Sequence, residues 1–256
     1  MADRYTYLPS IGITIMMAWG IPSLIKSEAT RHKILFPAAI AFFIIMSVLT
    51  WKQCGYWKNS ITLYSHTLQA TKDNYIVHYN LGQALFAEGR IEEASYHYNK
   101  AICIRPNYTN AYIGRGISYA KLGQHQLAIE DYNEAIRLKQ DFALAYYNRG
   151  LAYVELGHYQ QSIEDFNKAI RLNPNDARAY NNRGLSYDKL GQYQLAIEDF
   201  NKAISLIPYY SKAYINRGNS YLNHGNKNLG CNDAQKACEF GNCKLLETVK
   251  SIGNCH

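Results

Sequence analysis

Six glycines, each 34 residues after the previous one, constrain the fold of this chain more than any other feature. A period of this length indicates a stack of similar supersecondary units, because one unit cannot bury its apolar face alone. A second glycine series with the same step runs beside the first, so we expect an all-α repeat array. The two series are Gly55, Gly89, Gly123, Gly157, Gly191 and Gly225, and Gly82, Gly116, Gly150, Gly184 and Gly218.

The repeated unit reads as two helices joined by a glycine turn, as in "AYIGRGISYAKLGQHQLAIEDYNEAIRL" and "AYYNRGLAYVELGHYQQSIEDFNKAIRL". Small residues at fixed places let the paired helices approach closely, and aromatic side chains fill the space beside them. Many of the 23 tyrosines are therefore packing residues of the repeat. The clearest two series are Tyr112, Tyr146, Tyr180 and Tyr214, and Tyr119, Tyr153, Tyr187 and Tyr221.

This pattern resembles the tetratricopeptide repeat (TPR), whose small and aromatic signature residues recur here together. The resemblance implies a right-handed superhelix with a concave surface. A degenerate half repeat, which lacks a normal first helix, is expected before the array, and a capping helix with a Cys-rich tail is expected after it. The expected boundaries are 53–74 for the half repeat, 75–108, 109–142, 143–176, 177–210 and 211–244 for the five repeats, and 245–256 for the cap.

Repeats 2 to 5 carry an arginine in the first helix and an aspartate in the second, equally far from the turn glycine. Antiparallel helices should bring these side chains face to face as structural ion pairs, which specify geometry more than they add stability. The first repeat has Leu81 and His97 instead, so the two positions change together. The predicted pairs are Arg115–Asp131, Arg149–Asp165, Arg183–Asp199 and Arg217–Asp233.

Two uncharged apolar stretches, 7–25 and 34–51, precede the repeats. As helices they would span roughly 27–29 Å, close to the hydrocarbon thickness of a bilayer. A signal peptide is the alternative for the first stretch, but it lacks a strongly basic start and a small-residue cleavage site. Buried globular helices are the other alternative, but two in tandem that end at Trp51 favour the membrane. We therefore expect two transmembrane helices, as a hairpin over residues 1–52.

The orientation of this hairpin follows from charge and from cysteine. The loop "KSEATRHK" carries as many basic residues as both outer flanks together, and packs them more densely, which places it in the cytoplasm. Four of the six cysteines lie in the last 26 residues, and paired cysteines suit an oxidising compartment. We therefore expect a multi-pass membrane protein with its repeats on the extracytoplasmic (periplasmic or lumenal) side.

The order "ADRYTYLP", two apolar spans, "YWKNSITLYSHTLQAT" and then TPRs resembles a known layout. It is similar to the C-terminal part of multi-spanning membrane glycosyltransferases with an extracytoplasmic TPR array, whose animal members are protein O-mannosyltransferases. In that family the catalytic acidic residues lie in an early loop, many spans upstream, and nothing in this chain matches it. The resemblance therefore implies a non-catalytic end of such an enzyme, from a truncated gene, a split gene or a fragment.

A search for catalytic chemistry in the sequence finds no constellation. The eight histidines have neither HxxxH nor HExxH spacing, and there is no P-loop, no G-x-S-x-G and no dinucleotide-binding motif. Charges are interleaved despite a net charge of +7, so no segment reads as a nucleic-acid arm. We expect no enzyme activity, no cofactor and no metal, and read Cys54 and Cys103 as lone buried thiols.

The four late cysteines are candidates for two disulfides. Cys231 and Cys238 are seven residues apart on one helix, so their Cα atoms are roughly 10 Å apart, beyond the bridging limit. An antiparallel helical hairpin instead sets Cys238 near Cys243 and Cys231 near Cys255, and we predict those two bridges. A zinc site is disfavoured by the absence of CxxC spacing, and four reduced thiols are the remaining alternative.

The first helix of each TPR lines the concave groove, and asparagine recurs at one inward position. An Asn amide both donates and accepts, so a row of them can grip an extended peptide backbone, as a similar ladder in O-GlcNAc transferase suggests by resemblance. The alternative is that Asn is simply common at this site. An apolar strip and a basic far end would suit a segment with apolar and acidic stretches. The predicted groove residues are Asn80, Asn148, Asn182 and Asn216, then Tyr79, Ile113, Tyr147 and Leu151, then Arg178 and Lys212.

Two functional interpretations follow from these features. The first is a membrane-anchored TPR scaffold that binds protein or peptide segments in its groove. The second is the substrate-recruiting C-terminal portion of a membrane protein glycosyltransferase, which would work with a separate catalytic membrane subunit. A cytosolic co-chaperone would need the Lys/Asn/Arg carboxylate clamp of such TPR proteins, which is not evident here.

Overall fold

The computed structural model describes residues 33, 37, 40–51, 59–251 and 255, and this part of the chain is helical with no strand. The chain divides into two compact units, residues 1–66 and 67–256. Each unit is treated by itself below.

The first unit holds a helix over 40–51 and the start of α4 (Ser60–Ala70). The predicted span 7–25 lies outside the described residues, and so does most of 34–39. The side chains of the helix over 40–51 are almost all exposed, including Trp51 at 84%. Among the residues that the structure describes, no helix combines the length and apolar character needed to cross a bilayer.

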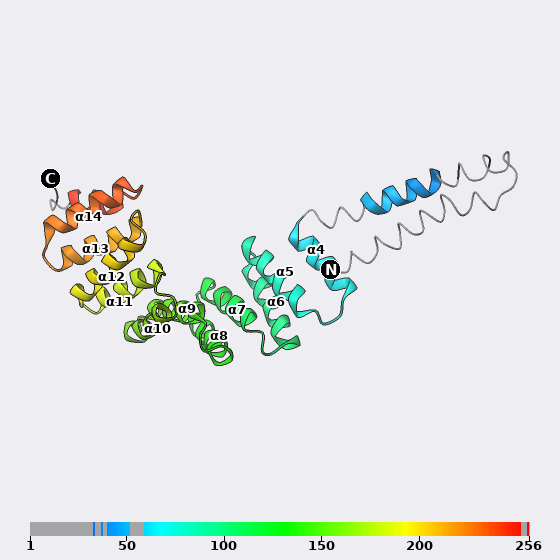
Figure 1. Ribbon diagram of the computed structural model, residues 1–256, viewed down its shortest axis with the longest axis horizontal. Helices are drawn as coiled ribbons and strands as arrows, with labels where there is room; N and C mark the ends of the chain where they lie inside the picture. Colours follow the sequence, from blue (N-terminus) through cyan, green and yellow to red (C-terminus); the bar gives the residue numbers. More distant parts are fainter. Residues whose placement is uncertain (1–32, 34–36, 38–39, 52–58, 252–254, 256) are drawn as a thin grey trace. The chain divides into compact units, whose positions relative to one another are not determined.

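The second unit is a stack of antiparallel helix pairs in chain order (Figure 1). In each pair the first helix packs on the second, and the second packs on the first helix of the next pair. First helices of successive pairs also contact each other directly, so they share one face of the stack. The pairs are α5 (Tyr75–Ala87) with α6 (Ile91–Ile104), α7 (Thr109–Lys121) with α8 (His125–Leu138), α9 (Ala143–Glu155) with α10 (Tyr159–Leu172), α11 (Ala177–Lys189) with α12 (Tyr193–Leu206), and α13 (Ser211–Asn223) with α14 (Lys227–Glu239).

The turn inside each pair depends on its glycine. Gly123 follows α7 with φ +76°, a region that residues with a Cβ rarely adopt. The N–H of Gln124 then donates to the carbonyl of Tyr119 at 2.8 Å, which satisfies a carbonyl at the helix end. The same positive φ recurs at Gly89, Gly157, Gly191 and Gly225, so the 34-residue period is a period of helix stops.

The second glycine series makes room for aromatic rings. A Cβ added at Gly116 would lie 2.6 Å from the Tyr132 ring, so a larger residue here would force the buried ring or the helices to move. Tyr132 is 1% exposed and belongs to a core with Ala128, Ala135 and Ala145. Small residues at the crossings and one ring per repeat therefore form a continuous core.

Helix α15 (Lys244–Ser251) covers the end of the stack. Its Leu245 and Val249 are buried and pack with Ala234 of α14. A Cβ at Gly218 of α13 would lie 3.0 Å from Leu245, so α15 fits closely against the last pair. The helix thus covers apolar surface that a further repeat would otherwise bury.

Candidate functional site

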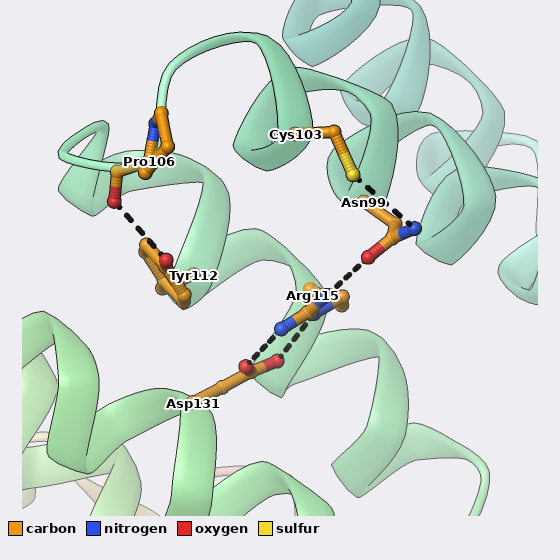
Figure 2. A network of polar contacts seen from close by, with 6 residues as sticks. All are labelled: Asn99, Cys103, Pro106, Tyr112, Arg115 and Asp131. Atoms are coloured by element: carbon orange, nitrogen blue, oxygen red, sulfur yellow. Dashed lines mark hydrogen bonds and ion pairs between the residues drawn. The ribbon is translucent and has the colours of Figure 1, made fainter.

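Each of four arginines on first helices holds the aspartate on the second helix of its own repeat. Nε and Nη2 of Arg115 on α7 donate to the two carboxylate oxygens of Asp131 on α8, at 2.9 and 2.7 Å (Figure 2). The side chains are 17% and 6% exposed. The structure brings together all four predicted pairs, Arg115–Asp131, Arg149–Asp165, Arg183–Asp199 and Arg217–Asp233.

Each arginine also reaches the repeat before it, which was not predicted from the sequence. Nη1 of Arg115 donates to Oδ1 of Asn99 on α6, as Figure 2 shows. The asparagines are 34 residues apart, and this spacing was the signal that could have revealed them. We call these arginines, aspartates and asparagines together the arginine ladder. Its other links between repeats are Arg149 to Asn133, Arg183 to Asn167 and Arg217 to Asn201.

The arginine ladder is flanked by the two tyrosine series. The guanidinium carbon of Arg115 lies 5.7 Å from the ring centre of Tyr112 and 5.8 Å from that of Tyr119. The Tyr112 hydroxyl also donates to the carbonyl of Pro106, at 3.0 Å, across the repeat boundary. The three later arginines lie between tyrosines in the same way. These tyrosines therefore bind the cation through their ring faces as well as fill space.

Charge inside the ladder is balanced locally. Burial raises the pKa of the Asp131 carboxyl above its ordinary value, and the hydrogen bonds and charge of Arg115 oppose this shift. Burial acts to lower the pKa of Arg115. The hydrogen bonds and charge of Asp131 outweigh burial, so the pKa of Arg115 lies above its ordinary value. Arginine stays charged at any pH at which proteins fold, and two donors aimed at one carboxylate favour its ionised form. The ladder is thus a structural ion-pair network within and between repeats.

Two adjacent hollows open on the face that the first helices of repeats 1 to 3 share. We call them the first and second hollow; their volumes are about 330 and 420 Å³. Phe86 of α5 and Ile117 of α7 line both. The walls are mainly apolar. Further lining residues are Tyr79, Tyr98, Ile113 and Phe142 in the first hollow, and Tyr132, Asn148, Leu151 and Glu155 in the second.

Polar atoms without partners accompany these apolar walls. Nδ2 of Asn148 and Nδ1 of His125 are buried without a hydrogen bond, and both residues line the second hollow. Tyr98 and Tyr132 line the first and second hollows, and within the described residues their hydroxyls make no hydrogen bond. Burial raises the pKa of both hydroxyls, so they remain protonated donors at neutral pH. Buried polar groups normally have partners, so the unpartnered nitrogens of Asn148 and His125 mark a place where a ligand can supply them.

The predicted asparagine row behaves differently in its second half. Nδ2 of Asn182 donates to the Tyr147 hydroxyl at 3.0 Å, and Nδ2 of Asn216 donates to Oδ1 of Asn181 at 3.0 Å. Asn181 in turn donates to Oδ1 of Asn182 at 3.2 Å. The Nδ2 groups of Asn182 and Asn216 are therefore occupied by neighbouring side chains. Of the four predicted members, Asn148 lines a hollow with an unpartnered amide nitrogen.

The remaining predicted groove residues are spread along the same helices. Asn80 on α5 is half-buried and lines neither hollow. Arg178 on α11 lies over the Tyr147 ring, 5.3 Å from its centre, and pairs with Asp176 at 3.0 Å. Lys212 on α13 is exposed. The apolar hollows and the two predicted basic residues, Arg178 and Lys212, thus occupy different repeats.

Family sequence patterns match most of this array. The pattern described as "TPR repeat" matches residues 82–123, 118–157 and 150–191, and the pattern described as "Tetratricopeptide repeat" matches 177–210. The chain belongs to the tetratricopeptide repeat proteins. Its TPR array accounts for the helix pairs, the glycine turns and the shared face of the first helices.

Proteins of known name resemble the TPR region. A protein O-mannosyl-transferase of Caenorhabditis elegans is 31% identical over 108 residues, which are 42% of this chain and 15% of that protein. Protein O-mannosyl-transferase TMTC3 of Homo sapiens is 32% identical over 130 residues, which are 51% of this chain and 14% of that protein. The chain thus spans about a seventh of the length of these relatives over the matched part.

Solved TPR structures share the fold. The crystal structure of MamA superposes with a TM-score of 0.59 at 31% identity, and covers 62% of this chain and 94% of that one. YrrB, described as a TPR protein with an unusual peptide-binding site, superposes with a TM-score of 0.61 at 22% identity, and covers 73% and 97%. The second likeness establishes the fold alone.

The first TPR departs from the arginine ladder through a histidine pair. His78 and His97 stand where later repeats have tyrosine and aspartate, and their Nδ1 atoms lie 3.0 Å apart. The rings are stacked, with centres 5.3 Å apart. Burial lowers the pKa of both, and His97 is lowered further by the charge of His78. A single proton can bridge the two Nδ1 atoms, so this contact excludes a proton on both Nδ1 atoms, which two charged rings would have.

The Cys-rich tail of the last TPR holds two disulfides, Cys231–Cys255 and Cys238–Cys243. Their Cα atoms are 5.7 and 3.9 Å apart. The structure therefore brings together the two cysteine pairs that helical spacing predicts. Within the described residues, no group of three or more His, Cys, Asp or Glu side chains could hold a metal ion.

Cys103 corrects one expectation, because it is exposed rather than buried. The same position of the later repeats carries Arg137, Arg171 and Ser205, so it faces solvent throughout the TPR array. Cys54, the other cysteine expected to be buried, lies outside the described residues.

Proposed function

We propose that this protein is a membrane-anchored TPR scaffold that binds an extended protein or peptide segment on the face of its first helices. The observation that carries this function is the pair of apolar hollows with unpartnered polar atoms between α5 and α9. Ligand sites combine apolar walls with a few polar groups that fix orientation. An extended segment suits a face on which these features run from repeat to repeat.

Binding to defined peptides tests this function. The full chain, held in detergent micelles, is titrated into fluorescent ten-residue peptides that contain two bulky apolar residues and an acidic end. We expect saturable binding by fluorescence anisotropy, and weaker binding of peptides with the same length but only serine, glycine and lysine. Equal binding of both peptide sets, or binding of neither, would exclude the scaffold function.

Membrane anchoring is the second part of the proposal. It is supported by the two uncharged stretches 7–25 and 34–51 and by the exposed apolar side chains of the helix over 40–51. A helix that is apolar on all sides requires either a protein core or lipid around it. We expect the full chain to stay with membranes after an alkaline carbonate wash. Its release into the soluble fraction would contradict the anchor.

The extracytoplasmic side is proposed for the TPR array because of its disulfides and the dense basic charge of the loop between the two stretches. Cys103 is an exposed native thiol in the array and serves as the reporter. In Cys54→Ser protein, a membrane-impermeant maleimide added to intact cells should label Cys103. The matched control carries Ser27→Cys together with Cys54→Ser and Cys103→Ser, and should be labelled only after lysis. The reverse pattern would invert the topology.

A second candidate function is recruitment of acceptor proteins for a membrane glycosyltransferase. The similarity of the TPR region to protein O-mannosyl-transferases favours it. Under this function, segments crosslinked to the groove should carry hexose at Ser or Thr when the chain is present with a catalytic partner subunit. If the crosslinked proteins carry no added hexose, the recruitment function is excluded and only the scaffold function remains.

A further inference from the structure

We infer that the two hollows of repeats 1 to 3 are the specificity site of the groove, and that they take two bulky apolar side chains of an extended, acidic polypeptide segment. This inference rests on the proposed scaffold function and assigns its ligand. In an extended chain, successive side chains point to opposite faces, so every second side chain faces the groove. Two neighbouring hollows that share Phe86 and Ile117 as a common wall match such a pair.

The choice of aromatic residue separates these repeats from the others. Repeats 1 and 2 carry Tyr98 and Tyr132 at the position where repeats 3 and 4 carry Phe166 and Phe200. All four rings are buried against glycines of the second series, so the packing does not need the hydroxyl. In the described part of the chain the two hydroxyls bond to nothing, and each belongs to a residue that lines a hollow. They are placed to bond the backbone of a segment whose side chains enter the hollows.

Gly114 shapes the first hollow. It interrupts the asparagine row, and a Cβ at this position would lie 2.7 Å from the Tyr98 ring. An asparagine therefore fits at 114 only if Tyr98 moves. Glycine at this place leaves the ring and the hollow open, whereas the next member of the row, Asn148, carries an unpartnered amide nitrogen at the second hollow.

The second half of the face offers less to a ligand. Asn181, Asn182 and Asn216 bond one another and the Tyr147 hydroxyl. Asp188 accepts a hydrogen bond from Ser220. These groups already have partners, and breaking a bond to make a new one gains little. The main contacts of a ligand should therefore lie in repeats 1 to 3.

The charge of the face identifies an acidic segment. Lys121 lines the second hollow, and Lys189 lies at the same repeat position two repeats later. With Lys212, these three make no ion pair within the described residues, and Glu155 is the one carboxylate that lines a hollow. Opposite charge on the ligand is favoured by this excess of lysine. The acidic residues of the segment should lie toward repeats 4 and 5.

Paired variants test this assignment with the full chain in detergent micelles. Leu151→Glu places a charge in the second hollow, and Leu185→Glu, at the same position one repeat later, lines neither hollow. Tyr98→Phe with Tyr132→Phe removes only the two hydroxyls, and the exposed Tyr96→Phe is its control. Circular dichroism melting verifies that each variant is folded. The probes are the ten-residue peptides that contain two bulky apolar residues and an acidic end. Matched peptides carry lysine in place of the acidic residues.

We expect Leu151→Glu to weaken binding more than tenfold and the double Tyr→Phe variant to weaken it about fivefold for each hydroxyl, a factor that corresponds to about 1 kcal/mol. Both controls should bind as the wild type does, and the lysine peptides should bind more weakly. If Leu185→Glu alone weakens binding, the assignment to repeats 1 to 3 fails while the scaffold function stands. If no peptide binds the wild type, both fail. If Leu151→Glu instead changes the molar mass by light scattering, a second copy occupies the hollows and the assignment is overturned.

Discussion

At the scale of single residues, the arginines of the ladder join three groups that lie far apart in sequence. Arg149 bonds Asp165 of its own repeat and Asn133 of the previous one, between the rings of Tyr146 and Tyr153. Lysine could not reproduce this planar fork of donors. The arginine therefore sets the angle between helices and the distance between repeats with one side chain.

Removing this arginine should destabilise the fold by leaving a buried carboxylate unpaired. For Arg149→Ala we expect a loss of roughly 3 kcal/mol in the free energy of unfolding, at the low end for buried pairs because the arginine is partly exposed. A double variant, Arg149→Met with Asp165→Leu, should recover most of the loss. Urea unfolding followed by circular dichroism measures both. The surface pair Arg90–Glu93 is the control, and Arg90→Ala should leave the midpoint almost unchanged. An equal loss in the double variant would show that the charge pair itself is needed.

The histidine pair of the first repeat should make stability depend on pH. The folded-state pKa of His78 and His97 is lowered, so the unfolded chain binds more protons below the ordinary pKa of about 6.5. The contribution of the neutral pair to the free energy of unfolding is then fully present above this pH. It is lost as the pH falls toward the lower pKa values of the folded state. Lys100 and Arg90 oppose protonation, and Asp73 and Glu93 favour it. The thermal midpoint should drop less between pH 7.5 and 5.5 in His97→Gln than in the wild type. An identical drop in both proteins would rule out the pair as the cause.

At the scale of elements, α15 depends on the tail for its position. It is eight residues long, too short to be a stable helix alone, and the Cys231–Cys255 bridge closes a loop with a sequence separation of 24 around it. The Cys238–Cys243 bridge closes a separation of five and constrains less of the unfolded chain.

Breaking the longer bridge should therefore loosen the cap selectively. Cys231→Ser with Cys255→Ser should reduce stability by about 2–4 kcal/mol, the usual range for a disulfide, and should speed amide hydrogen exchange in α15. Cys238→Ser with Cys243→Ser is the matched control and should have the smaller effect. Hydrogen exchange read by mass spectrometry, with peptides from α14 and α15, distinguishes the two. If hydrogen exchange in α15 is unchanged after loss of the Cys231–Cys255 bridge, the burial of Leu245 and Val249 is enough to hold the helix in place.

Sequence alone predicts those elements whose geometry repeats with the 34-residue period. The turn at Gly123, the facing of Arg115 and Asp131, and the reach of Cys231 to Cys255 all follow from distances along one or two helices. These distances are fixed by helix rise and by antiparallel pairing. The spacing of residues along one helix, or across two antiparallel helices, is therefore enough to place them.

Contacts between repeats were harder to predict. Asn99 meets Arg115 because of the rotation from one repeat to the next, and a sequence period does not contain that rotation. The hollows depend on small differences among similar residues, such as Gly114 in place of Asn and Tyr98 in place of Phe. The asparagine row was predicted as four equivalent groups, but Asn181 lies beside it and occupies the amide of Asn216. Such neighbours are visible only once the helices are packed.

At the scale of the whole molecule, a TPR array is a one-dimensional stack in which each repeat contacts only its neighbours. Its stability is therefore a sum of repeat terms and interface terms. The asparagine of the ladder is the polar part of each interface, because it joins the second helix of one repeat to the arginine of the next.

Asn167→Ala should weaken one interface in the middle of the array, between repeats 3 and 4. It removes one hydrogen bond to a charged group, which contributes about 1.5–3 kcal/mol. We expect the urea transition to broaden or split, because the two halves of the stack then unfold less cooperatively. Asn228→Ala, at an exposed position of α14, is the control and should keep a single sharp transition. A uniform shift of one sharp transition would show that the remaining contacts keep the array cooperative.

The ends of the arginine ladder also bear on how such a chain changes length during evolution. Leu81 stands at the first arginine position and Gln235 at the last asparagine position, so both end repeats depart from the ladder, whereas repeats 2 to 4 carry the same ladder residues. An in-frame loss of residues 143–176 would set Arg183 against Asn133, which occupies the same place as its present partner Asn167. Duplication of that segment would likewise supply each new arginine with an asparagine. The number of interior repeats can therefore change during evolution without leaving a charge unpaired. Loss of an end repeat would instead remove Leu81 or Gln235, which no other repeat carries at the same position.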